Sequence, residues 1–138
     1  MSRREVFLDI PLGRIAALRA GDPNGPKVLA LHGWLDNAAS FSRLAPLLDG
    51  VRIVALDLPG HGHSDHRPLG AAYNIWDYAH DVLQTAEQFG WRRFSLLGHS
   101  MGAIVCVLKT GCRKGTLITS SISASEANTA SGPAVSRP

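Results

Sequence analysis

One short segment of the sequence, FSLLGHSMG at residues 94–102, combines a nucleophilic side chain with a local structure that could present it to a substrate. Its G-x-S-x-G pattern, with Ser100 between Gly98 and Gly102, lies between a run typical of a strand and a run typical of a helix. A serine on such a bend is exposed at the end of a sheet, where the amino end of the helix stabilises a developing oxyanion. The alternative is that Ser100 only caps the following helix, a position in which serine is favoured.

A second segment ends at the same predicted edge of the sheet. His32, Gly33 and Trp34 directly follow the apolar run KVLAL. We expect the backbone N–H groups of Trp34 and Met101 to be two oxyanion donors, because a nucleophile elbow takes one donor from each of these loops. Simple packing of the Trp34 side chain is the alternative.

Histidines gather in a third segment, DLPGHGHSD at residues 57–65. Its glycines and proline require a tight, irregular turn. His61 and His63 are potential metal ligands, but no further carboxylate or cysteine stands at an obvious ligand spacing, so we predict no metal site. We expect His61 and His63 to have structural roles in this loop instead. The same is expected of the remaining histidines, His66, His80 and His99.

Hydrophobic periodicity predicts the strands that must position these segments. Two runs joined by a Pro-Leu-Gly turn predict a β-hairpin, at residues 6–10 and 14–20. Three nearly continuous apolar runs predict parallel strands that are buried on both faces, at residues 27–33, 51–57 and 94–98.

Helices are predicted between and after these strands. Residues 75–89 have the apolar spacing of an amphipathic helix, which Asn74 can cap and Gly90 can end. A shorter helix bent at a proline is expected at residues 40–48, and another helix begins at residue 101. Strands alternating with helices predict an α/β layered fold, with a mostly parallel sheet that opens with an antiparallel hairpin.

The composition changes once along the chain, near Leu108. Residues 109–138 contain ten Ser or Thr and no aromatic residue, so we expect a polar, low-complexity tail that is disordered. The one alternative within it is a short strand at LITSSI (117–122). The sharpness of the change is typical of a frameshift or an altered splice junction. A regulatory tail is the alternative.

Charge and hydropathy exclude two classes of partner. The net charge is +3, but residues 1–108 hold ten Lys or Arg and ten Asp or Glu, so the excess lies in the tail. No aromatic residues stand among the basic residues of the tail, and we predict no nucleic-acid partner. We find neither an apolar run long enough to span a membrane nor a secretory signal, and expect a soluble, cytoplasmic protein with no membrane partner.

Taken together, LHGW (31–34), DLPGHGHSD (57–65) and GHSMG (98–102) resemble the α/β-hydrolase superfamily, in the family's order and near its usual spacing. Its cofactor-free serine hydrolases, of the small-esterase and C–C hydrolase kind, are the most similar. The resemblance implies that Ser100 is the nucleophile and that Trp34 and Met101 donate to the oxyanion, with no cofactor and a small ester-like substrate. It argues against the epoxide-hydrolase and dehalogenase branches, which have an aspartate in place of Ser100. The supporting motif residues are His32, Gly33, Gly98, His99 and Gly102.

The resemblance covers residues 5 to about 108, so we expect residues 1–108 to be only the amino-terminal half of such a domain. In this fold the triad acid and histidine follow the nucleophile, yet here the last histidine is His99 and the only acid beyond Ser100 is Glu126. His99 adjoins Ser100 and is expected to diverge from it, and His32 and His61 are not used as the base in the family. We therefore expect a truncated chain that is inactive or weakly active.

Two alternatives to a truncated hydrolase stay open. The strand at residues 94–98 would lack a partner on one side, and such an open edge could mediate self-association or binding of another protein. The same motifs also fit a fragment of an acyltransferase.

Overall fold

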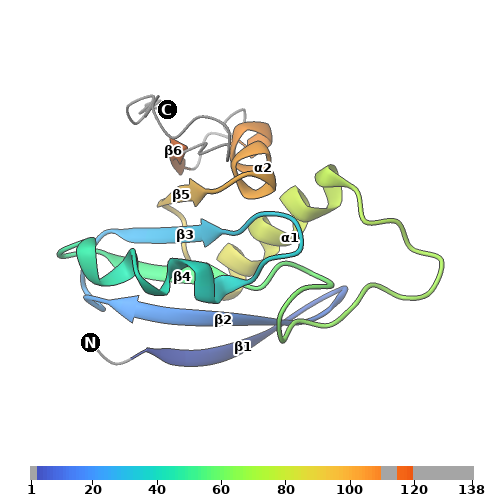
Figure 1. Cartoon of the computed structure of the whole chain (residues 1–138), viewed down its shortest axis with the longest axis horizontal. Helices are drawn as coiled ribbons and strands as arrows, with labels where there is room; N and C mark the ends of the chain where they lie inside the picture. Colours follow the sequence, from blue (N-terminus) through green and yellow to red (C-terminus); the bar gives the residue numbers. More distant parts are fainter. Residues whose placement is uncertain (1–2, 110–114, 120–138) are drawn as a thin grey trace.

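Six strands form one sheet, in the order β1-β2-β4-β3-β5-β6 (Figure 1). The computed structural model describes residues 3–109 and 115–119. The strands are β1 (Arg4–Ile10), β2 (Gly13–Gly21), β3 (Lys27–Leu31), β4 (Arg52–Leu56), β5 (Phe94–Gly98) and β6 (Gly115–Thr119). The helices are α1 (Ile75–Gln88) and α2 (Met101–Lys109), and two 3-10 helices, η1 (Ala38–Ser42) and η2 (Ala45–Leu47), follow β3.

The sheet is antiparallel at its start and parallel beyond it. β1 pairs antiparallel with β2, and β2 pairs antiparallel with β4. β4, β3, β5 and β6 are mutually parallel, so the carboxyl ends of β3, β4 and β5 lie at one edge of the sheet. This arrangement confirms the predicted α/β class with its amino-terminal hairpin.

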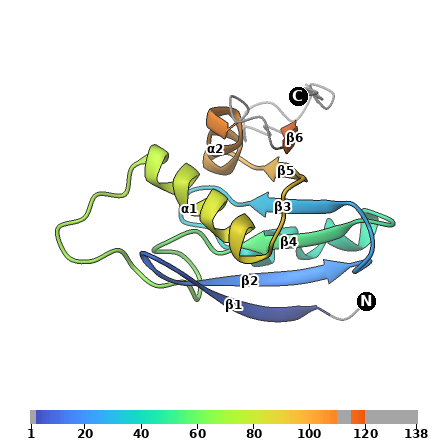
Figure 2. The ribbon, with the colours of Figure 1, turned by 180° about the vertical axis from the view of Figure 1, so that it is seen from behind.

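Each face of the sheet is covered by a different layer. Leu29 and Leu31 of β3 pack in a core with α1 and α2, whereas Val28 and Ala30 pack on the opposite face with η1. Figures 1 and 2, seen from opposite sides, show the 3-10 helices over one face and α1 over the other. Burial on both faces explains why the sequence of these strands is almost continuously apolar.

The predicted ends of α1 are confirmed. The Asn74 side chain accepts a hydrogen bond from the Asp77 N–H, and Gly90, with φ +69°, follows the last turn. The helix predicted at residues 40–48 is instead the two short 3-10 helices, with Pro46 in the second. None of the helices in the described part of the chain is long and apolar enough to cross a membrane.

The predicted open edge at β5 is wrong. β6 pairs parallel with β5 along its whole length, from Phe94 opposite Gly115 to Gly98 opposite Thr119. The prediction of disorder for residues 109–138 is therefore wrong for residues 115–119, and α2 extends one residue past the predicted boundary, to Lys109. For residues 110–114 and 120–138 that prediction lies outside the described residues.

Candidate active site

Ser100 lies on the bend between β5 and α2, as the motif predicts. Its φ is +54°, in the left-handed region that residues with a side chain rarely adopt. The residue is exposed, and its carbonyl accepts hydrogen bonds from Ala103 and Ile104, at 3.0 and 3.3 Å. Within the described chain the Ser100 hydroxyl itself has no hydrogen-bond partner, so it is not held as a side-chain cap of α2.

Three glycines make this bend possible. A Cβ on Gly98 would lie 2.5 Å from the Gly102 carbonyl oxygen, and a Cβ on Gly102 would overlap the Leu31 carbonyl group of β3. A Cβ on Gly33 would stand 3.1 Å from the Cβ of Ser100. The loop after β3 therefore lies directly against Ser100, and at positions 98 and 102 only glycine permits the close approach of strand and helix.

The backbone around Trp34 leaves one N–H group free beside this bend. The next two N–H groups are occupied, since Leu35 donates to Nε2 of His61 at 3.2 Å and Asp36 donates to the Gly33 carbonyl at 3.3 Å. Neither Trp34 nor Met101 donates its backbone N–H to any group among the residues described. Met101 begins α2, where N–H groups lack partners inside the helix. Trp34 is 56% exposed, and its ring packs edge-on against that of His61, with 5.4 Å between the ring centres, so packing explains its position only in part.

The buried side chain of His32 hydrogen-bonds the backbone of two loops. Its Nε2 accepts the Leu58 N–H at 3.0 Å, which assigns the ring proton to Nδ1, and Nδ1 donates to the Gly33 carbonyl at 2.6 Å. The side chain is fully buried, and this burial lowers its pKa. His32 therefore joins the loops after β3 and β4 as a neutral ring, with both nitrogens occupied.

This role of His32 predicts a loss of stability in acid. The unfolded chain binds a proton at His32 with a pKa near 6.5, whereas the folded chain binds it only at lower pH. The stability that His32 contributes is therefore complete above about pH 6.5 and falls as the pH drops below that value, by up to about 1.4 kcal/mol per pH unit. Urea unfolding at pH 7.5 and 5.5 should show a smaller drop in His32→Gln than in the original chain. An equal drop would contradict the assignment, and His80→Gln, on the exposed face of α1, is the control.

None of the other histidines hydrogen-bonds the Ser100 hydroxyl among the described residues, and His61 and His63 have other partners. His61 is buried, accepts the Leu35 N–H through Nε2 and hydrogen-bonds the Pro59 carbonyl through Nδ1 at 3.0 Å. His63 is exposed and binds Glu5 at 2.5 Å, a contact that raises the pKa of His63. His99 makes no hydrogen bond to the Ser100 hydroxyl in the part of the chain described. No group of three potential metal ligands is present among the described residues.

Sequence reasoning missed two groups that build the loop next to the site. Both carboxylate oxygens of Asp57 accept backbone N–H groups, of Ala38 at 2.7 Å and of His63 at 2.8 Å. Further along, Arg67 and Asp81 form a buried ion pair at 2.7 Å. The position of Asp57 at a strand end was a signal for the first. The only sequence signal for the Arg67–Asp81 ion pair was the position of Asp81 beside the apolar stripe of α1.

Comparison with known proteins identifies the family of this chain. The profile of the family described as alpha/beta hydrolase fold matches residues 26–109. A serine hydrolase-like protein of Homo sapiens is 46% identical over 102 residues, covering 73% of this chain and 50% of the relative. The structure of hypothetical protein PA1622 from Pseudomonas aeruginosa PAO1 is 56% identical with a TM-score of 0.78, covering 89% of this chain and 46% of that one.

A more distant solved structure has the same fold. It is a membrane phospholipase A, described as a bacterial virulence factor, and is 30% identical with a TM-score of 0.80, covering 92% of this chain and 42% of that one. This chain thus spans half or less of the length of each of these three proteins. With the family profile matching more than half of its residues, the chain belongs to the alpha/beta hydrolase fold family.

Proposed function

We propose that this chain carries the nucleophile of a serine hydrolase that acts on esters or related acyl compounds, and that the nucleophile is Ser100. The observation that supports this most directly is the exposed Ser100 with φ +54° at the bend between β5 and α2. A residue other than glycine keeps such a strained conformation only where the surrounding structure imposes it, and these positions concentrate at functional sites. The close packing of Gly33, Gly98 and Gly102 around the bend imposes it here.

The proposed reaction is acyl transfer to water. The Ser100 oxygen attacks the carbonyl carbon of the substrate, its proton passes to a base, and the carbonyl oxygen becomes an oxyanion held by the N–H groups of Trp34 and Met101. The leaving alcohol takes up the proton, and a water molecule then releases the acyl group as a carboxylic acid. The similarity to a serine hydrolase-like protein and to a phospholipase A supports an acyl substrate.

The base for this reaction is expected outside the 138 residues. No histidine follows Ser100, and the ring nitrogens of His32 and His61 are occupied by backbone hydrogen bonds. We infer that the acid and histidine correspond to the part of the relatives' length that this chain does not cover. The chain by itself should therefore turn over esters poorly or not at all, since an oxyanion hole alone leaves only a residual acceleration, about 10³- to 10⁴-fold over water.

A fluorophosphonate probe tests both parts of this proposal. Mass spectrometry should find slow labelling at Ser100, no labelling at that position in Ser100→Ala, and unchanged labelling in Ser40→Ala, which removes another exposed serine. Rapid labelling that Ser100→Ala abolishes would show that the chain contains its own base. Labelling spread equally over exposed serines would contradict the nucleophile assignment.

A further inference from the structure

Four basic side chains form a row across the sheet, away from Ser100. Arg4 of β1 stands directly opposite Arg19 of β2, and Arg52 of β4 stands directly opposite Lys27 of β3. The two pairs are neighbours, because Arg19 faces Val54, two residues along β4 from Arg52. We call these four residues the basic row.

All four side chains of the basic row emerge on the same face of the sheet. Each of them stands two residues along its strand from a residue of the core beneath α1, and side chains two residues apart on a strand point to the same face. These core residues are Val6, Ala17, Val54 and Leu29. Ring contacts agree with this placement, since the Arg52 guanidinium lies 5.3 Å and the Lys27 ammonium 5.9 Å from the centre of the Trp91 ring.

The positive charge of the basic row is not neutralised within the described chain. Like charges directly opposite each other on neighbouring strands are unfavourable. The ion pairs of the described residues involve His63 with Glu5 and Arg67 with Asp81, and none includes a member of the row. Glu5 follows Arg4 on β1, so its side chain points to the opposite face of the sheet. Four cations are thus gathered with no carboxylate bound to them.

A cavity of about 230 Å³ opens at this position. Arg4, Arg19 and Arg52 line it together with Ala20, Gly21 and Pro23. Arg52 uses one terminal nitrogen in a long contact, 3.5 Å, to the Pro23 carbonyl, but its Nε is buried without any hydrogen-bond partner in the described residues. Among the described residues, neither Arg4 nor Arg19 makes a side-chain hydrogen bond or ion pair, so their guanidinium donors at the cavity are not used by the protein.

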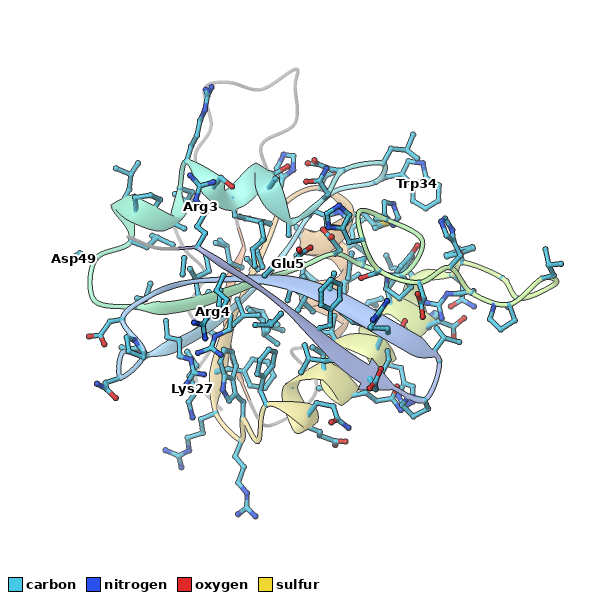
Figure 3. All side chains as sticks on the ribbon, turned by 90° about the horizontal axis from the view of Figure 1, so that it is seen from below. Arg3, Arg4, Glu5, Lys27, Trp34 and Asp49 are labelled. Atoms are coloured by element: carbon cyan, nitrogen blue, oxygen red, sulfur yellow. The ribbon has the colours of Figure 1, made fainter. Side chains whose placement is uncertain are left out.

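We propose that the basic row binds a phosphate group carrying at least two negative charges, such as that of a phosphate monoester or a diphosphate. Guanidinium groups match phosphate oxygens with paired N–H donors, and three of them converge on the cavity. The site lies at the amino ends of β3 and β4, opposite the edge that carries Ser100. In Figure 3, Arg4 and Lys27 lie at one end of the molecule and Trp34 at the other. The ligand of the basic row is therefore separate from the acyl substrate.

Calorimetric titration of the full chain with inorganic pyrophosphate, at fixed ionic strength, tests the site. We expect binding that weakens at least tenfold in Arg19→Gln and in Arg52→Gln. Arg43→Gln, which removes an exposed arginine after η1, should bind as the original chain does. Arg19→Gln also relieves the repulsion from Arg4, so its melting temperature without anion should not fall, and lost binding then does not report unfolding.

A second arm distinguishes the source of the phosphate. Vesicles of phosphatidylcholine, with and without phosphatidic acid, are sedimented with the same proteins. Binding that needs phosphatidic acid and is lost in Arg19→Gln, without binding of pyrophosphate, supports the same phosphate chemistry presented by a lipid headgroup. Absence of both kinds of binding, or equal weakening in Arg19→Gln and Arg43→Gln, would overturn the proposal, because the attraction would then be general to the protein's charge.

Discussion

Replacing Gly102 by alanine is expected to destabilise the chain by more than about 3 kcal/mol, although the residue lies in the first turn of α2. Helix propensity alone predicts the opposite, because alanine is favoured over glycine in a helix by about 1 kcal/mol. The added Cβ, however, would overlap the Leu31 carbonyl group and crowd that of His32. Backbone carbonyls of a central strand and its loop cannot rotate away as a side chain can, so α2 would have to separate from β3.

Urea unfolding measured by circular dichroism checks this expectation. Gly70→Ala is the control, because no atom lies within 4 Å of the position where its Cβ would stand and only the strain of its φ of +85° remains. That strain should cost on the order of 1 kcal/mol. A Gly102→Ala chain as stable as the original would show that α2 does not approach β3 as closely as described, and the bend at Ser100 would lose its support.

Much of the sheet was predictable from the sequence, and the physical reason is burial. Strands covered on both faces need apolar residues at nearly every position, so the runs that became β3, β4 and β5 predict them to within two residues. β6 was not predictable in this way. Composition over residues 109–138 is polar on average, and this average hides the short run GTLIT at 115–119 with its Leu117 and Ile118. Pairing with β5 also uses backbone N–H and C=O groups, which every such segment carries.

The candidate site also has features that the sequence predicts and features that it does not. The bend at Ser100 and the close approach of strand and helix follow from the motif, since Gly98 and Gly102 stand where a Cβ would collide with backbone. The clamping roles of His32 and His61 do not follow from spacing, because they depend on which backbone N–H each ring nitrogen meets in three dimensions. The roles of Ser100, Trp34 and Met101 in catalysis stay predictions that the labelling experiment tests.

The Arg67–Asp81 pair gives the second large effect that we expect. Both side chains are almost fully buried, 4% and 6% exposed, and burial raises the pKa of Asp81 while the attraction of Arg67 opposes this. The Arg67 guanidinium also lies against the rings of Tyr73 and Tyr78, at 5.4 and 5.1 Å from their centres. The pair thus fastens the loop after β4, which Figure 1 shows extending away from the sheet, to α1.

Asp81→Ala is therefore expected to lower the free energy of unfolding by about 3–5 kcal/mol, because it leaves the Arg67 charge buried without a counterion. Glu87→Ala, an exposed acid on the same helix, should change it by less than about 0.5 kcal/mol. The double variant Arg67→Met with Asp81→Leu should recover most of the loss, because no unpaired charge then remains in the interior. Urea unfolding of the three variants separates this cause from a general weakening of α1. If the double variant is as unstable as Asp81→Ala, the buried charge is not the reason.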